Sequence, residues 1–156
     1  MSPAALTLVC PRVADTVALG ERLGRALDQG ELLSLEGPLG AGKTTLVRGI
    51  AIGAGADPQQ VRSPTFVLHH VYRGSRHTLH HLDLYRLSPQ SSLVVLDIEG
   101  LLASGAVVVE WGDHSGLSRW DPIRVRVEIG DAEERVLTLT SPAPSRIRQA
   151  WDAWAP

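Results

Sequence analysis

The sequence predicts a single compact α/β domain, in which a mixed β-sheet is flanked by helices. Short apolar runs that are typical of buried strands, such as Leu32–Glu36 and Ala106–Glu110, alternate along the chain with segments of helical periodicity. The chain of 156 residues also has the length of about one domain, and it can bury a core without disulfides or metals.

The first half of the chain is expected to alternate between strand and helix. In order, we expect a strand at residues 6–9, a helix from Asp15 or Thr16 to Gly30, a strand at Leu32–Glu36, a glycine-rich loop at Gly37–Gly42, a helix from Lys43 to about Ile52, and a loop at Gly53–Arg62. The first of these helices is predicted from its apolar face, which consists of Leu19, Leu23, Ala26 and Leu27.

The second half is expected to contain two hairpins that enclose a helix and a central strand. In order, we expect a hairpin of Val67–Tyr72 and Arg76–Asp83, a helix at Ser91–Ala103 whose end Gly100 weakens, a strand at Ala106–Glu110, and a hairpin of Arg124–Ile129 and Arg135–Leu139. Pro142 and Pro144 indicate a linker. We therefore predict one domain over residues 1–141 and a C-terminal tail over residues 142–156, with a short helix carrying Trp151 and Trp154.

The overall charge and the cysteine content exclude some classes of function. The net charge is −2, whereas a protein that holds nucleic acid unaided is usually basic, so we expect no DNA binding and any tie to RNA through a partner. The single cysteine, Cys10, excludes an internal disulfide and suits a reducing cytosol. Met1–Cys10 lacks a positively charged start, and no apolar run is long enough to span a membrane. We expect a cytoplasmic protein.

The decisive motif is the segment GPLGAGKT at Gly37–Thr44, which fits the phosphate-binding P-loop pattern G-x-x-x-x-G-K-[ST] and lies between a predicted strand and a predicted helix. Glycines let the backbone N–H groups turn inward and approach a phosphate closely, Lys43 reaches the β- and γ-phosphates, and the Thr44 hydroxyl binds Mg²⁺. The alternative is a chance glycine-rich turn. The candidate nucleotide-binding residues of the loop are Gly37, Gly40, Ala41, Gly42, Lys43, Thr44 and Thr45.

The use of lysine supports this interpretation of the loop. Of the fifteen lysine and arginine residues in the chain, only Lys43 is a lysine. A compact ammonium on a flexible stem enters a ring of phosphate oxygens that a planar guanidinium does not fit.

A P-loop that binds Mg-ATP also needs an acidic residue near the metal. Glu110 closes the apolar run Val107–Val109, where a carboxylate is costly to bury without a partner. Asp83 lies at the end of a predicted hairpin strand, close to several histidines. The alternatives are that Glu110 is an exposed acid at the start of a loop and that Asp83 caps a turn or helix.

Four blocks together resemble the TsaE (YjeE) family, the bacterial ATPase of tRNA threonylcarbamoyladenosine biosynthesis. The blocks are GPLGAGKTT at Gly37–Thr45, SPTF at Ser63–Phe66, HLDLYRL at His81–Leu87 and VEW at Val109–Trp111. The resemblance implies a P-loop NTPase-like mixed sheet and a Mg-dependent ATPase that supports the TsaD–TsaB transferase pair and meets tRNA only indirectly. It makes residues 1–141 the ATPase domain.

The resemblance also implies roles for individual residues. Lys43, Glu110 and Asp83 would carry the chemistry: Thr44 and Glu110 would bind Mg²⁺, and Asp83 would orient the hydrolytic water or sit behind the metal ligands. Thr65 would sense the nucleotide from a mobile loop, and Trp111 would face the nucleotide or the partner. From the residues alone, Thr65 also fits a proline-bounded strand start, and Trp111 a core or rim aromatic.

Three alternatives stay open. A small-molecule kinase shares the P-loop, although no arginine-rich lid segment is evident. A nucleotide-dependent switch would need the same loop and metal. A zinc site among the six histidines is disfavoured because they show no ligand spacing paired with cysteine, although His69 and His77 could lie across a hairpin. We expect His81 to orient Asp83 or to cap the loop.

Overall fold

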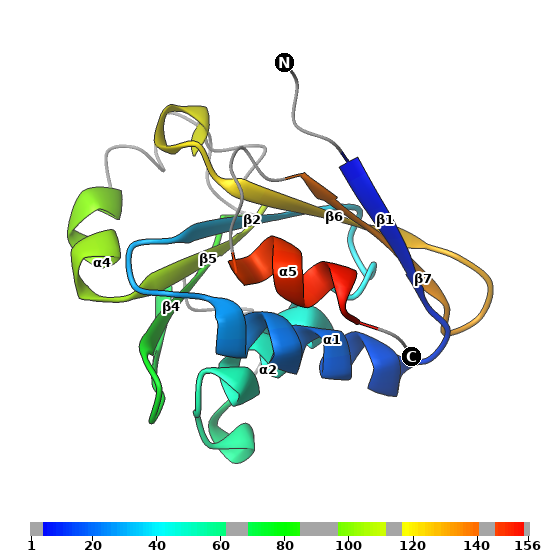
Figure 1. Ribbon diagram of the computed structural model, residues 1–156, viewed down its shortest axis with the longest axis horizontal. Helices are drawn as coiled ribbons and strands as arrows, with labels where there is room; N and C mark the ends of the chain where they lie inside the picture. The colour runs from blue at the N-terminus through cyan, green and yellow to red at the C-terminus, as the bar shows by residue number, and fades with distance from the viewer. Residues whose placement is uncertain (1–4, 62–68, 85–96, 112–116, 141–145, 155–156) are drawn as a thin grey trace.

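The sheet has seven strands and is mixed, as the sequence predicts (Figure 1). The computed structural model describes residues 5–61, 69–84, 97–111, 117–140 and 146–154. The strands are β1 (Ala5–Cys10), β2 (Leu32–Glu36), β3 (His69–Arg73), β4 (Thr78–Asp83), β5 (Ala106–Glu110), β6 (Ile123–Ile129) and β7 (Arg135–Thr140). The described helices are α1 (Val13–Ala26), α2 (Lys43–Gly53), α4 (Ile98–Ser104) and α5 (Arg146–Asp152), with short 3-10 turns η1 (Pro58–Gln60) and η3 (Leu117–Trp120).

Parallel strands at the centre of the sheet position the site. The strand order is β1-β7-β6-β2-β5-β4-β3, in which β2 runs parallel to β5 and β6, and β4 runs parallel to β5. The outer pairs β3–β4, β6–β7 and β1–β7 are antiparallel. Because parallel strands end at the same edge, the loop after β2 lies near the last residues of β4 and β5, Asp83 and Glu110.

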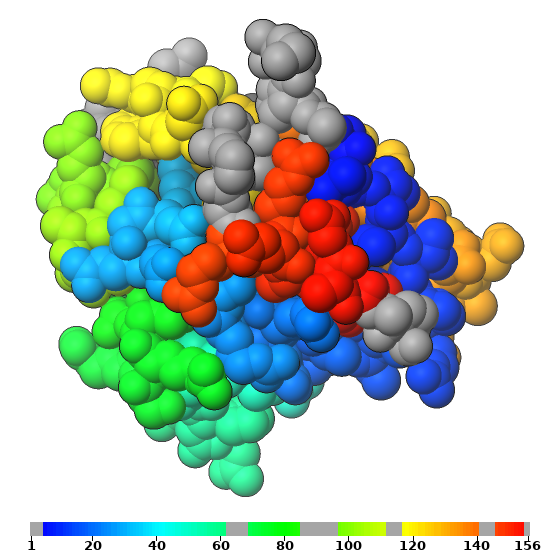
Figure 2. All heavy atoms as spheres, viewed as in Figure 1, coloured from blue at the N-terminus to red at the C-terminus, as the bar shows by residue number. Residues whose placement is uncertain are grey.

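The two faces of the sheet are covered by different helices. On β5, Ala106 and Val108 join the larger core cluster with α1, α2 and α5, whereas Val107 and Val109 join a smaller cluster with α4 and η3. Glu110 follows the alternation of Ala106 and Val108, so its side chain belongs to the face that carries α2. In Figure 2, α5 lies across this face against α1.

Glycines hold α1 and α2 in unusually close contact. A Cβ atom at Gly24 would lie 2.1 Å from the Ile50 carbonyl oxygen, and one at Gly49 would lie 2.2 Å from the Val17 carbonyl oxygen. Neither distance leaves room for a side chain, so the two backbones pack directly on each other. This contact fixes the position of α2, and therefore of the loop that leads into it.

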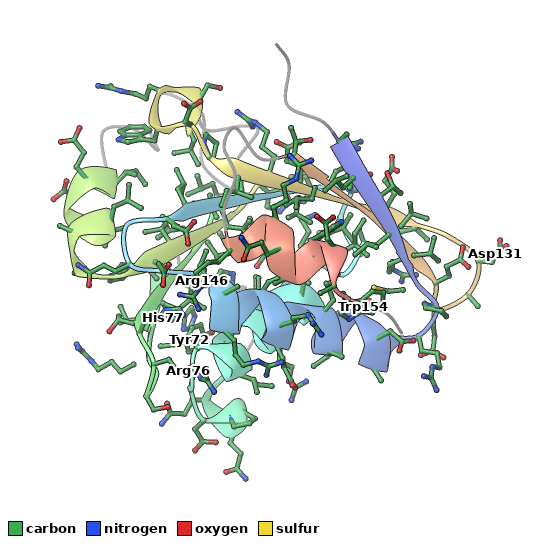
Figure 3. All side chains as sticks on the ribbon, viewed as in Figure 1. Tyr72, Arg76, His77, Asp131, Arg146 and Trp154 are labelled. Carbon is green, nitrogen blue, oxygen red and sulfur yellow. The ribbon has the colours of Figure 1, made fainter. Side chains whose placement is uncertain are left out.

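The C-terminal helix is part of the core. Ile147, Trp151 and Trp154 are buried in the larger cluster, and Trp154 is labelled in Figure 3. The short helix expected within residues 142–156 is thus present as α5, but it carries only Trp151, because it ends at Asp152, before Trp154. No helix among the described residues is both long and apolar enough to cross a membrane.

The strands, the two hairpins and α2 are confirmed within the described residues, while residues 67 and 68 of the first expected hairpin strand lie outside them. The start and end of α1 differ from the prediction. The helix begins at Val13, with Arg12 as its N-cap, rather than at Asp15 or Thr16. Asp15 lies three residues inside, where its carboxylate accepts the Arg12 backbone N–H at 3.0 Å and completes a capping box. The helix ends at Ala26, so Gly30 lies beyond it.

The helix expected at Ser91–Ala103 is shorter than predicted. The helix α4 begins at Ile98, capped by Asp97, and residues 91–96 lie outside the described residues. Gly100 is near the start of α4 and does not weaken its end. Its backbone N–H donates to the Asp97 carboxylate at 3.0 Å, so the glycine belongs to the N-terminal cap.

Candidate functional site

The loop between β2 and α2 has a backbone that only glycine adopts easily. Gly37, Gly40 and Gly42 have φ angles of 139°, 78° and 104°. A Cβ atom at Gly37 would also lie 2.2 Å from the Val127 carbonyl oxygen of β6, which excludes a side chain there. The loop ends at the N-terminus of α2, where the first backbone N–H groups have no partner within the helix and the helix dipole favours an anion.

Lys43 lies at the start of α2 and folds back over the loop. Its side chain is buried, with an exposed fraction of 4% for the residue. The Nζ atom donates to the carbonyl oxygens of Gly37 at 2.6 Å and Pro38 at 2.8 Å. These carbonyls stabilise an ammonium that burial would otherwise destabilise. The single lysine of the chain therefore lies within the candidate loop.

Trp111 covers the Lys43 ammonium. The Nζ atom lies 3.8 Å from the centroid of the indole ring, a cation–π contact. The backbone of Trp111 has a φ of 64°, which is uncommon for a residue with a side chain, and its N–H donates to the Leu35 carbonyl at 3.1 Å. The indole also packs against the smaller core cluster. Trp111 is thus a rim aromatic that touches the loop lysine.

Thr44, Glu110 and His81 form a connected polar cluster beneath the loop. The Thr44 hydroxyl donates to the Glu110 carboxylate oxygens at 3.0 and 3.3 Å. The His81 Nε2 atom lies 2.6 Å from Glu110 Oε2, and the exposed fractions of the two side chains are 0% and 4%. The prediction that His81 orients Asp83 or caps the loop is therefore wrong, because its ring nitrogen contacts Glu110.

Asp83 lies beside Glu110 at the end of the neighbouring strand. The two residues are paired in the register of β4 and β5, and the Leu84 N–H donates to the Glu110 carbonyl at 3.1 Å. Asp83 is half-buried. The fold thus brings both predicted acids to the edge where the loop lies. Thr45 is half-buried in the first turn of α2, and Thr65 lies outside the described residues.

The donor set of the cluster fits a magnesium ion. The Thr44 hydroxyl and the Glu110 carboxylate are hard oxygen ligands, they already lie within hydrogen-bonding distance, and they are next to the loop. His81 contacts the Glu110 carboxylate from behind, as the partners of metal-binding carboxylates commonly do. Because Glu110 is buried, it is not an exposed acid at the start of a loop.

Three of the other described histidines, His69, His77 and His80, bond to other parts of the fold. His69 Nε2 lies 3.0 Å from His80 Nδ1, and His80 Nε2 lies 2.8 Å from the Ser104 hydroxyl. Burial lowers the pKa of both His69 and His80. His77, labelled in Figure 3, lies 2.9 Å from the Gly24 carbonyl and not across from His69. Within the described part of the chain, no group of three or more histidine, cysteine or acidic residues could hold a metal.

An arginine that the sequence did not reveal also contacts the loop. Arg135 is the first residue of β7, and its Nε atom donates to the Ala41 carbonyl at 2.9 Å. Its NH1 group donates to the carbonyls of Ala132 at 3.0 Å and Glu134 at 2.7 Å. No sequence signal separates Arg135 from the other arginines, because the contact depends on the β6–β7 hairpin lying beside β2.

The chain matches the family model described as "Threonylcarbamoyl adenosine biosynthesis protein TsaE" over residues 10–137. Proteins named tRNA threonylcarbamoyladenosine biosynthesis protein TsaE are similar to it. The one from Mycobacterium leprae is 44% identical over 114 residues, which cover 67% of this chain and 70% of that protein. The one from Nostoc is 41% identical over 129 residues, which cover 80% and 79%. The one from Aquifex aeolicus is 34% identical over 126 residues, which cover 80% and 88%.

The fold is also similar to a solved structure. The crystal structure of Bacillus subtilis YdiB superposes with a TM-score of 0.75, covering 97% of this chain and 95% of that chain at 22% sequence identity. This likeness supports the P-loop-like α/β fold, while the sequence matches identify the family. The family model spans most of the chain, including the loop, both acids and Trp111. The chain belongs to the TsaE family.

Proposed function

We propose that this protein binds Mg-ATP at the Gly37–Thr44 loop and hydrolyses it in support of tRNA threonylcarbamoyladenosine biosynthesis. The single observation that carries the proposal is the joint placement of Lys43 and of the Thr44–Glu110 pair at one edge of the sheet. The loop supplies groups that bind phosphate, and the pair supplies oxygen ligands for a metal. Its relatives' names state the pathway.

Phosphate binding follows from the loop and from Lys43. The Lys43 ammonium donates to two loop carbonyls. Phosphate oxygens carry more negative charge than carbonyl oxygens and form stronger, charge-assisted bonds with an ammonium. On binding ATP, Lys43 would exchange at least one carbonyl for a phosphate oxygen. Because Trp111 lies on Lys43, its indole would sense this exchange.

Hydrolysis would use the two acids in different ways. Thr44 and Glu110 would hold Mg²⁺, which neutralises phosphate charge when it is bound. Asp83 ends the strand next to Glu110, and in this proposal its carboxylate would accept a hydrogen bond from water near the metal ligands. A metal ligand contributes to ground-state affinity, whereas a group that orients water acts mainly in the transition state.

The partner would perform the transfer to tRNA. We propose that the protein supports a TsaD–TsaB transferase complex and does not itself hold tRNA or DNA. The net charge of −2 supports this, because binding to a phosphate backbone is driven largely by positive charge. A site in which Lys43 is already buried and satisfied suits a protein whose activity depends on its nucleotide state.

The proposal is tested in cells that are depleted of the endogenous protein. Wild-type protein should restore threonylcarbamoyladenosine in tRNA, and Lys43→Ala should not. Arg48→Ala is the matched control, because Arg48 is an exposed cation on the same helix, α2. Full restoration by a stably expressed Lys43→Ala variant would contradict the proposal.

A second measurement separates hydrolysis from switching. Single-turnover hydrolysis of ATP is measured with and without the purified partner complex and tRNA. Hydrolysis that accompanies modification supports the ATPase. Modification that proceeds equally with a non-hydrolysable ATP analogue would show that the nucleotide state alone matters. Transfer of phosphate to a small acceptor would indicate a kinase.

A further inference from the structure

We infer that Arg135 is a positioning residue for nucleotide binding, because it fixes the orientation of the Ala41–Gly42 peptide in the loop. The inference deepens the proposed function and rests on it. Its basis is the 2.9 Å hydrogen bond from the Arg135 Nε atom to the Ala41 carbonyl oxygen. This contact joins β7, far away in the sequence, to the centre of the phosphate-binding loop.

The geometry of the peptide gives this contact its consequence. In a trans peptide the C=O of one residue and the N–H of the next point in opposite directions, and the described residues contain no cis peptide. By holding the Ala41 carbonyl on the side of β7, Arg135 directs the Gly42 N–H to the opposite side of the peptide. That N–H belongs to the motif whose backbone cradles the phosphates.

The glycine makes such an anchor necessary. Gly42 has a φ of 104° and precedes the helix α2, and glycine loses more conformational freedom on folding than other residues. A peptide next to it rotates easily unless something holds it. The Arg135 Nε atom lies 3.8 Å from where a Gly42 Cβ would be, so the guanidinium rests against this hinge.

The guanidinium is itself held rigidly. Its NH1 group donates to the carbonyls of Ala132 and Glu134 in the β6–β7 turn. That turn is closed by backbone bonds from Gly130 N–H to the Glu134 carbonyl at 3.0 Å and from Glu134 N–H to the Asp131 carbonyl at 2.8 Å. Asp131 marks this turn in Figure 3. Arg135 thus connects a closed turn to a glycine hinge.

A cationic donor also changes the peptide it binds. A hydrogen bond to the carbonyl polarises the amide, so the N–H on its other side becomes a better donor. Orientation and polarisation both favour binding of a phosphate oxygen. We therefore expect Arg135 to act on affinity for nucleotide and not on the chemistry of hydrolysis.

The test compares three variants of the full chain by titration with ADP and Mg-ATP. Arg135→Gln removes the charge and most donors. Arg135→Lys keeps the charge, but its single nitrogen cannot reach the Ala41 carbonyl and the turn together. The control is Arg126→Gln on the same hairpin. Arg126 forms an exposed ion pair with Glu128, and its side chain lies on the opposite face of the sheet from that of Arg135. Thermal unfolding and the backbone amide NMR signal of Gly42 are recorded for each.

The expected result is a loss of affinity that charge alone does not explain. Arg135→Gln and Arg135→Lys should both bind ADP and Mg-ATP about tenfold more weakly, the effect of one hydrogen bond to a charged group. The Gly42 amide signal should shift in both, and Arg126→Gln should match the wild type. The rate of single-turnover hydrolysis at saturating ATP should change less than the affinity does.

Other outcomes overturn the inference in distinguishable ways. Wild-type affinity in Arg135→Lys would show that only the positive charge matters. A fall in thermal stability with an unchanged Gly42 signal would show a purely structural role. Unchanged affinity in Arg135→Gln would refute the inference and leave ATP binding intact. Failure of the wild type to bind either nucleotide would instead refute the proposed function.

Discussion

Replacement of His81 offers the sharpest test of how Glu110, the proposed metal ligand, is held. His81 Nε2 lies 2.6 Å from Glu110 Oε2, and both side chains are almost fully buried. The Thr44 hydroxyl donates to the same carboxylate. In His81→Phe, Glu110 keeps its burial but loses the imidazole. In His81→Gln, an amide N–H remains at a reach close to that of the Nε2 atom.

The size of the effect follows from this environment. Leaving a buried polar group without its partner costs about 1–3 kcal/mol of stability. For a domain of this size that is roughly 3–10 °C in the unfolding temperature. Loss of a group that orients a metal ligand weakens metal binding or activity by about 10- to 100-fold. His81→Phe should therefore need about that much more Mg²⁺ for half-maximal ATP hydrolysis, and His81→Gln should recover most of the loss.

The assay separates the metal from the fold. ATP affinity is measured over a series of Mg²⁺ concentrations and again in excess chelator. His70→Gln is the control. His70 on β3 is paired with His81 on β4 and contacts its ring, but β3 and β5, which carries Glu110, lie on opposite sides of β4. His81→Phe should lose affinity only when Mg²⁺ is present. An unchanged Mg²⁺ requirement, or an equal fall of ATP affinity without metal, would show that His81 does not hold Glu110 for the metal.

Three further predictions address the chemistry, the packing and the thiol. Asp83→Asn should keep ATP affinity but slow single-turnover hydrolysis by about 10²–10⁴-fold, whereas Glu110→Gln should lose both; the opposite pattern would exchange the two roles. Gly24→Ala should lower the free energy of unfolding in urea by about 1–3 kcal/mol, because its Cβ would lie 2.1 Å from the Ile50 carbonyl, and an unchanged midpoint would contradict this contact. Burial raises the pKa of the Cys10 thiol to about 11, so the unfolded chain ionises first and stability should fall as pH rises from about 9 to 11. Thermal unfolding of Cys10→Ala across this range should lack that fall, and an equal fall in the variant would rule out the thiol.

The features predicted correctly from sequence are those encoded in local patterns. The apolar runs of β2 and β5, the alternation in β6 and the glycines of the loop each specify their own backbone, so their positions are confirmed. The loop after β2 lies at the same edge of the sheet as Asp83 and Glu110, because β2, β5 and β4 are parallel and end at one edge.

The errors at helix ends have a physical cause. Asp15 and Thr16 are favoured N-cap residues, but the helix α1 extends back to Val13 because Asp15 caps it from the third position through the Arg12 N–H. Gly100 is a helix breaker by propensity, yet at the start of α4 it only completes the cap of Asp97. Propensity alone does not say which end of a helix a residue occupies.

Contacts between distant segments could not be predicted from one sequence. The register of β4 against β5 pairs His81 with Val108 and Asp83 with Glu110. The His81 ring reaches along the sheet to the Glu110 carboxylate, a contact that depends on this register. The role of Arg135 depends on β6 lying beside β2. Trp111, whose ring contacts Lys43, has a positive φ that no residue pattern indicates.

Calorimetric titration of the purified protein with Mg-ATP measures directly whether Lys43 and the loop around it bind the nucleotide phosphates. Wild-type protein and Arg48→Ala should bind Mg-ATP with the same affinity. Lys43→Ala and Lys43→Arg should stay folded, with unfolding temperatures roughly 3–10 °C lower because the Gly37 and Pro38 carbonyls lose their donor. Both should lose Mg-ATP binding, because Ala has no ammonium and a planar guanidinium does not fit the space between those carbonyls. Binding of Mg-ATP by Lys43→Ala with wild-type affinity would show that the Lys43 ammonium does not hold the phosphates.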